Sequence, residues 1–132
     1  MIELTGTGLT TDDVVAVARD GAPVTLAAEA RSAMEASAAV VARLANQAEP
    51  AYGVSTGFGS LANVTIPVER REELQRALVR SHAAGMGPPV ENEVVRAMML
   101  LRARTLSMGC SGARPLLAET MLALLNAGIT PV

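Results

Sequence analysis

Apolar residues recur at helical spacing in three long segments of this sequence, and breaks rich in glycine or proline separate the segments. The segments cover residues 25–47, the stretch that begins after Pro67, and residues 91–108. Positions three or four residues apart lie on one face of an α-helix, so each segment predicts a helix with one apolar face. The pattern therefore predicts a mainly α fold.

Local signals at the ends of these segments set the expected boundaries. Thr25 is a plausible N-cap for the first long helix, and Ser111 for a last helix that carries Pro115 in its first turn. Near the N-terminus we expect a short strand at Ile2–Leu4 and a helix near Thr11–Arg19. The fold is thus expected to hold at most short strands.

The same spacing indicates which faces of two helices are buried. The helix over residues 91–108 is expected to bury Val94, Ala97, Met98, Leu101 and Thr105. The helix after Pro67 is expected to line one face with Leu74, Ala77, Leu78 and Ser81, and His82 falls on the same side.

Composition indicates what builds the core and which classes of partner are excluded. Of the 132 residues, half are hydrophobic but only 2% aromatic, so a compact domain needs an aliphatic core. A net charge of −2 gives no footprint for nucleic acid or an anionic membrane. The lone Cys110 excludes an internal disulfide and a cysteine zinc site. No secretory signal or membrane span is evident, so we expect a soluble, cytoplasmic chain.

A glycine-rich loop from Tyr52 to Pro67 interrupts the helical pattern. Gly53, Gly57 and Gly59 alternate with polar residues around the only tyrosine and phenylalanine of the chain. Glycines let a backbone bend tightly near a ligand, so Tyr52 is a candidate acid or base if its surroundings stabilise a phenolate. The alternative is a glycine-rich surface loop with Tyr52 packed on the core, and composition alone favours it.

The only histidine, His82, lies at the end of a predicted helix beside the glycine break at residues 85–89. It is a candidate functional residue if that break opens onto a cavity. The alternative is a hydrogen-bonded core histidine, which spacing alone favours. One histidine, one cysteine and scattered carboxylates form no ligand cluster, so no metal site is expected.

Five blocks of the sequence, in their order and spacing, resemble the histidine ammonia-lyases of the aromatic amino-acid ammonia-lyase family. They are AYGVSTGFG at 51–59, SHAAGMGPP at 81–89, VRAMMLLRARTL at 95–106, GCSGARP at 109–115 and LLNAGITPV at 124–132. The opening stretch from Leu9 to Leu26 is also similar, so the resemblance covers essentially the whole chain.

The resemblance implies the helical ammonia-lyase fold and the non-oxidative deamination of L-histidine to trans-urocanate and ammonia. Tyr52 matches the family's catalytic tyrosine, His82 its substrate-side histidine, and Gly59 a backbone position that lines the same pocket. The family uses a methylidene-imidazolone (MIO) electrophile, made by cyclisation of an internal Ala-Ser-Gly. The complete enzymes are homotetramers.

The expected Ala-Ser-Gly lies beyond Val132 in the family's pattern and is absent from this chain. Cys110-Ser111-Gly112 aligns with a helix-capping block, so we reject it as the source of the electrophile. Residues 1–132 are therefore expected to be an incomplete N-terminal portion that is inactive alone, with apolar faces of the last two helices exposed. Such faces favour oligomerisation.

Two alternatives to a histidine enzyme stay open. Related ammonia-lyases and aminomutases act on phenylalanine or tyrosine, although the pair Ser81-His82 looks more like the histidine enzymes. The chain could instead be a non-catalytic helical interaction module derived from such an enzyme.

Overall fold

The computed structural model describes residues 1–131, and Val132, the last residue of the block at 124–132, lies outside the described residues. The chain forms two compact units. The terminal unit comprises Met1–Ala39 and Pro88–Val132, and the central unit comprises Val40–Gly87. Helices predominate, as the sequence predicted, and the two strands have three residues each.

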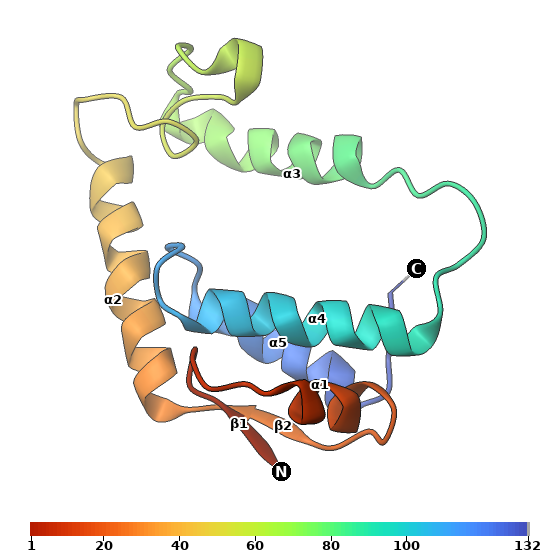
Figure 1. Ribbon diagram of the computed structural model, residues 1–132. Helices are drawn as coiled ribbons and strands as arrows, with labels where there is room; N and C mark the ends of the chain where they lie inside the picture. The colour runs from red at the N-terminus through yellow and green to blue at the C-terminus, as the bar shows by residue number, and fades with distance from the viewer. Residues whose placement is uncertain (132) are drawn as a thin grey trace. The chain divides into compact units, whose positions relative to one another are not determined.

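The terminal unit combines a small parallel sheet with helices (Figure 1). Its elements are β1 (Ile2–Leu4), α1 (Thr11–Ala18), β2 (Val24–Leu26), the first part of α2 (Ala28–Ala45), α4 (Asn92–Ser107) and α5 (Pro115–Asn126). β1 and β2 pair in parallel with Ile2 opposite Val24, and α1 makes the crossover between them. The amide of Ile2 donates to the carbonyl of Pro23 at 2.8 Å, and the amide of Ala27 to that of Leu4 at 3.0 Å.

The core of the terminal unit is aliphatic, as composition requires. One buried cluster joins the sheet to three helices through Leu4, Val17, Val24, Leu100 and Leu125. A second cluster of Met34, Leu106 and Ala118 joins α2 to α4 and α5.

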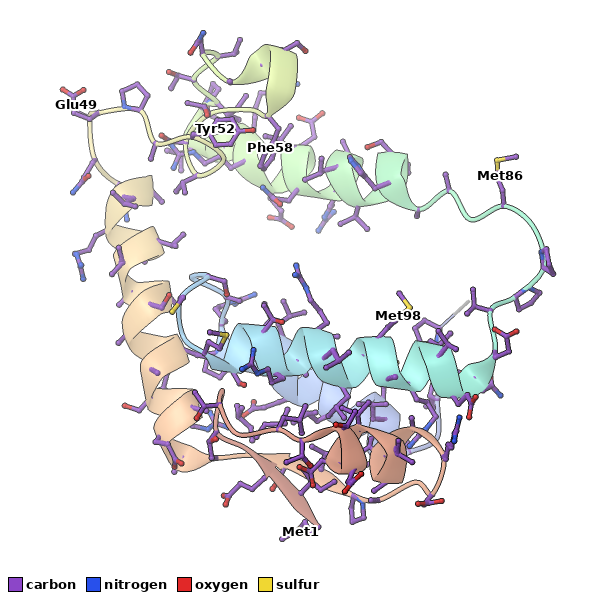
Figure 2. All side chains as sticks on the ribbon, viewed as in Figure 1. Met1, Glu49, Tyr52, Phe58, Met86 and Met98 are labelled. Atoms are coloured by element: carbon purple, nitrogen blue, oxygen red, sulfur yellow. The ribbon has the colours of Figure 1, made fainter. Side chains whose placement is uncertain are left out.

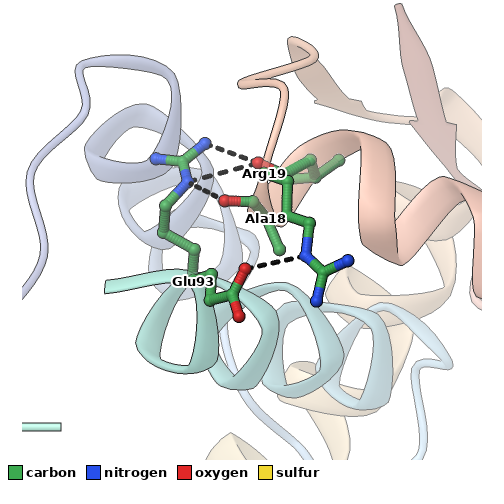
Figure 3. A network of polar contacts seen from close by, with 5 residues as sticks. Ala18, Arg19 and Glu93 are labelled. Carbon is green, nitrogen blue, oxygen red and sulfur yellow. Dashed lines mark hydrogen bonds and ion pairs between the residues drawn. The ribbon is translucent and has the colours of Figure 1, made fainter. Parts of the chain in front are cut away.

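Arg96 on α4 connects the ends of two other helices. Its Nη2 donates to the carbonyl of Val17 at 2.8 Å, and its Nε lies 3.2 Å from the carbonyls of both Val17 and Ala18. Its Nη1 donates to the carbonyl of Leu125 at 2.9 Å. The last carbonyls of a helix have no partner within the helix and carry partial negative charge, so a guanidinium there satisfies both needs. Figure 3 shows the contacts at the end of α1 beside the ion pair of Arg19 and Glu93, whose Nε and Oε2 are 2.7 Å apart.

Asn126 at the end of α5 acts as an additional partner for β2. Its Nδ2 donates to the carbonyl of Val24 at 2.8 Å, and its Oδ1 accepts from the amide of Val24 at 2.9 Å. A side-chain amide carries one donor and one acceptor group, so it can replace a neighbouring strand at one residue. This pair fixes α5 against the sheet.

The N-terminus of α1 is set by a capping box. The Thr10 hydroxyl accepts from the amide of Asp13, and the Asp13 carboxylate accepts from the Thr10 amide at 3.0 Å and the Thr10 hydroxyl at 2.7 Å. These hydrogen bonds from Thr10 lower the pKa of Asp13 below its ordinary value. The helix predicted near Thr11–Arg19 and the strand predicted at Ile2–Leu4 are both confirmed.

Two predicted caps are wrong. Thr25 lies in β2, where it pairs with Glu3, and α2 begins three residues later at Ala28. The N-cap of α5 is Arg114 rather than Ser111, because Pro115 already occupies the first turn. A threonine before an apolar run is compatible with a strand or a cap, and only the distant partner β1 decides between them.

The predicted buried face of α4 is also wrong. The buried residues are Met99, Leu100, Ala103, Leu106 and Ser107. The residues expected there lie mostly on the surface, with exposures of 41% for Val94, 62% for Met98 and 47% for Leu101. This helix carries apolar residues on more than one face, so spacing alone does not indicate which face meets the core of this unit.

The central unit holds the end of α2, a long loop and the helix α3 (Arg71–His82). The loop contains two short 3₁₀ turns, η1 (Gly59–Leu61) and η2 (Val68–Arg70). Arg71 ties the parts together, because its Nε donates to the carbonyl of Ile66 at 3.1 Å and its Nη1 to that of Ala45 at 2.6 Å. No residue of α3 is buried, so the apolar face expected from Leu74 to Ser81 is not a core face here.

We expect Arg96→Met to lower the free energy of unfolding of this chain by about 2–4 kcal/mol, because it removes a charged donor and the hydrogen bonds that the carbonyls of Val17 and Ala18 accept from it. Urea unfolding followed by circular dichroism measures the change. Arg102→Met, at an exposed position of the same helix, is the matched control and should change stability by about 0.5 kcal/mol or less. Equal effects of the two substitutions would contradict the role given to Arg96.

Candidate active site

The three site residues predicted from the sequence all lie in the central unit. Tyr52 and Gly59 belong to the loop between α2 and α3, and His82 is the last residue of α3. The Tyr52 side chain is 65% exposed, so it is not packed in a core. His82 and Gly59 are exposed as well. The interpretations of Tyr52 and His82 as buried core residues are therefore wrong for this structure.

The loop that carries Tyr52 is ordered by its own hydrogen bonds. The Ser55 hydroxyl accepts from the amide of Ala51 at 2.9 Å, and the Thr56 hydroxyl accepts from the amide of Gly53 at 3.1 Å. Thr56 also donates to the carbonyl of Gly57 at 3.0 Å. Ser55 and Thr56 are 3% and 4% exposed, so these contacts form inside the loop. Tyr52 thus lies within a short bonded turn.

A second set of contacts closes the loop on itself. The amide of Ile66 donates to the carbonyl of Ser55 at 2.9 Å, and the amide of Gly57 donates to the carbonyl of Val64 at 3.1 Å. Thr56 and Thr65 form an isolated antiparallel bridge between these bonds. Sequence reasoning missed Ser55 and Thr56 as organising residues; the signal was a serine and a threonine between glycines, a pattern typical of side chains that bond the local backbone.

The ring of Tyr52 meets the ring of Phe58 edge to face, with centroids 6.1 Å apart and planes at 80° (Figure 2). Such aromatic pairs are favourable beyond the area that they bury. Gly53 makes the pair possible, because its φ of +68° suits glycine and a Cβ there would lie 2.9 Å from Cε1 of Phe58. The glycine pattern therefore holds the two aromatic rings together and sets the direction of the phenol.

His82 is held by the helix that it ends. Its Nδ1 lies 2.9 Å from the carbonyl oxygen of Leu78 and 3.1 Å from the hydroxyl of Ser81. The Ser81 hydroxyl donates to the same Leu78 carbonyl at 2.9 Å. The imidazole is thus tied to the last turn of α3 through one nitrogen.

Tyr52, Gly59 and His82 are not joined to one another by any hydrogen bond in the described part of the chain. An apolar hollow of the central unit is lined by Leu61, Ile66, Leu74 and Ala77 with flanking Pro67, Arg70 and Glu73, and by none of the three site residues. This hollow lies over the first half of α3, whereas His82 ends a helix of twelve residues, about 18 Å long. The structure places the three residues in one unit without assembling them into one pocket.

The described residues hold no group of three or more histidine, cysteine or acidic side chains that could bind a metal ion. Among the helices of residues 1–131, none is long and apolar enough to cross a membrane. Cys110-Ser111-Gly112 forms a turn in which the amide of Gly112 donates to the Ser37 hydroxyl at 2.7 Å. The Gly112 amide is thus committed to holding this turn against α2.

Comparison with known proteins matches residues 9–132 to the family model "Aromatic amino acid lyase". Histidine ammonia-lyase of Streptomyces griseus is 59% identical over 125 residues, which cover 95% of this chain and 24% of that protein. Tyrosine aminomutase from Streptomyces globisporus has a similar structure, with a TM-score of 0.91 and 37% identity over 98% of this chain and 25% of that one. Histidine ammonia-lyase from Trypanosoma cruzi gives a TM-score of 0.84 and 35% identity over 96% and 24%. The chain spans about a quarter of the length of these relatives.

We expect Thr56→Val to loosen the loop without unfolding the terminal unit, because valine keeps the shape but loses the hydroxyl that bonds Gly53 and Gly57. The amide of Gly53 should exchange with solvent about fivefold faster or more, as expected for the loss of a buried hydrogen bond. Hydrogen exchange followed by NMR measures this rate. Ser60→Ala, an exposed hydroxyl of the same loop, is the control. An unchanged Gly53 rate in Thr56→Val would refute the proposed bonding.

Proposed function

The chain belongs to the aromatic amino acid lyase family, and from that membership we propose that the complete protein removes ammonia from L-histidine and forms trans-urocanate. The observation that carries the choice of histidine is the high identity to the histidine ammonia-lyase of Streptomyces griseus over nearly the whole chain. The fold is similar to that of an aminomutase as well as to that of a histidine ammonia-lyase. The fold alone therefore does not choose between these two reactions, and the choice of histidine rests on sequence identity.

In the proposed reaction Tyr52 acts as the base. Removal of a β-proton from an amino acid is difficult, because that proton is poorly acidic, and a phenolate is one of the stronger bases that a protein side chain supplies. The position of Tyr52 supports this role: its side chain is exposed and is directed by the Phe58 contact and the bonded turn around Thr56. A base must be held within hydrogen-bond reach of its proton, and this frame limits where the phenol can lie.

His82 and Gly59 are proposed to contact the substrate. His82 presents an exposed imidazole that α3 fixes through one nitrogen, which leaves the other nitrogen available. Gly59 has a φ of +55° and no atom within 4 Å of the position that a Cβ would take, so a ligand could approach its backbone closely. Their assembly with Tyr52 into one pocket would require the remaining part of the enzyme.

When present, an MIO group would supply an electrophile for the substrate amino group, so that ammonia could leave. The residues of this chain do not fit as its source. Cys110-Ser111-Gly112 is the segment with the nearest composition, but its Gly112 amide is bonded to Ser37 and Pro115 follows in the first turn of α5. We propose that an Ala-Ser-Gly outside these 132 residues provides the group, and that residues 1–132 alone have no turnover.

Exposed apolar side chains support a larger assembly. Met98 and Leu101 on α4 and Leu116 and Leu117 on α5 are between 47% and 62% exposed. Large apolar side chains exposed on two helices are candidates for contact with other protein. We propose that these faces are covered in a homotetramer of the complete enzyme, which would act in the cytoplasm.

A substrate panel tests the proposed function. The complete protein should use L-histidine with a kcat/KM at least about 100-fold above that for L-tyrosine or L-phenylalanine, a ratio that side-chain recognition commonly reaches. Release of urocanate, followed by its ultraviolet absorbance, and of ammonia measures turnover. Preferential use of tyrosine or phenylalanine, or formation of a β-amino acid, would replace the histidine assignment with the second candidate. No turnover of any of the three would favour a non-catalytic role.

We expect Tyr52→Phe to lower kcat of the complete enzyme by about 10²–10⁴-fold, the range for loss of a general base. Stability should change by about 0.5 kcal/mol or less, because Tyr52 is largely exposed and phenylalanine keeps the contact with Phe58. Tyr52→Leu removes the aromatic pair as well as the hydroxyl. Comparison of the two variants therefore distinguishes the effect of the hydroxyl from the effect of the ring. Full activity of the phenylalanine variant would show that Tyr52 is not the base.

A further inference from the structure

Three polar groups meet at the last turn of α3, and together they determine which nitrogen of His82 carries a proton. Nδ1 of His82 lies 2.9 Å from the carbonyl oxygen of Leu78 and 3.1 Å from Oγ of Ser81. Oγ of Ser81 lies 2.9 Å from the same carbonyl oxygen. Two side chains therefore share one backbone acceptor.

The roles of these groups follow from which of them can donate. A backbone carbonyl oxygen only accepts hydrogen bonds, so Nδ1 must be the donor in its contact with Leu78. The Ser81 hydroxyl, 2.9 Å from the same oxygen, can donate its single proton to it, and Oγ then faces Nδ1 with a lone pair. With the proton on Nε2 instead, the lone pair of Nδ1 would face the Leu78 carbonyl oxygen at 2.9 Å even if the Ser81 hydroxyl turned to donate to Nδ1. The hydrogen bond of one ring nitrogen sets the state of the other.

We propose that the Leu78 carbonyl and the Ser81 hydroxyl hold neutral His82 in the Nδ1–H form, so that Nε2 is presented as a hydrogen-bond acceptor. Ser81 is then a positioning residue, because it acts through His82. His82 and its neighbours Ser81 and Ala83 are all exposed residues.

The consequence for binding rests on the proposed function. An unprotonated Nε2 accepts from an N–H or O–H group and has no proton to give to a carboxylate. His82 is therefore assigned to an N–H donor of the amino-acid substrate and not to its carboxylate. Ser81 also fixes the ring plane, which lowers the freedom that is lost when the donor binds.

The tautomer can be measured directly on this chain, because His82 is its only histidine. After labelling with ¹⁵N-histidine, long-range ¹H–¹⁵N correlation spectra at a pH of about 9, where ordinary histidines are neutral, distinguish the protonated from the unprotonated ring nitrogen. The same chain in concentrated urea supplies the reference for a free imidazole. We expect Nδ1 to be the protonated nitrogen in the folded chain. A folded spectrum equal to the reference, or one with the proton on Nε2, would overturn the proposal.

Two substitutions at one position test the part of Ser81. Ser81→Ala should move the tautomer population toward that of the urea reference, and Ser81→Thr, which keeps a hydroxyl, should retain the wild-type spectrum. Backbone chemical shifts of α3 report whether the helix is intact in each variant. An intact helix with an unchanged tautomer in Ser81→Ala would leave the Leu78 carbonyl alone in this role and would overturn the assignment of Ser81.

Kinetics of the complete enzyme supply the second readout. Ser81→Ala should raise KM for L-histidine by about two- to tenfold, as expected for one hydrogen bond, with kcat nearly unchanged, and Ser81→Thr should restore KM. An equal KM in all three proteins would overturn the positioning role. Because the spectra need no turnover, an Nδ1–H form in a protein that does not use histidine would refute the proposed function and leave the tautomer assignment standing.

Discussion

The guanidinium of Arg96 is the contact on which the terminal unit depends. Its N–H groups donate to carbonyls at the ends of α1 and α5, those of Val17, Ala18 and Leu125. One side chain of α4 therefore connects three helices that are far apart in the sequence. Aliphatic packing draws the helices together but is not directional. The hydrogen bonds of Arg96 are directional, and so are the two hydrogen bonds between the Asn126 side chain and the backbone of Val24. They fix the position of each helix along its own axis relative to its neighbours. Together they supply a register that a core of leucine, valine and alanine lacks.

The sequence predicts local structure well where the deciding partner is close in the chain. The helix that begins at Thr11 needed only the Thr10–Asp13 box, and the helix ends at the glycine breaks needed only the glycines. Prediction fails where a distant segment decides. Thr25 pairs with Glu3 across a crossover, and the buried face of α4 is selected by α1 and α5 from two apolar faces that look alike in the sequence.

The candidate site shows the same division. Tyr52, Phe58 and His82 stand out in the sequence because each is the only residue of its type. In the structure the rings of Tyr52 and Phe58 pair, and the side chains of Tyr52 and His82 are exposed. The bonding that orders the loop was not predicted, because Ser55 and Thr56 look like ordinary loop residues until their backbone partners are known. The pocket itself was beyond prediction from these residues, since Tyr52 and His82 lie on different parts of the central unit without a shared contact.

The N-terminal residues form part of the fold. The strand β1 begins at Ile2, its amide bonds Pro23, and Leu4 is 1% exposed in the core, whereas Met1 is 89% exposed. Loss of Met1 to an aminopeptidase would therefore leave the stability of the fold unchanged. Loss of four residues would remove all of β1 and the core side chain of Leu4, and would destabilise the fold. A segment joined ahead of Met1 would leave the strand and the core in place, because Met1 itself is exposed.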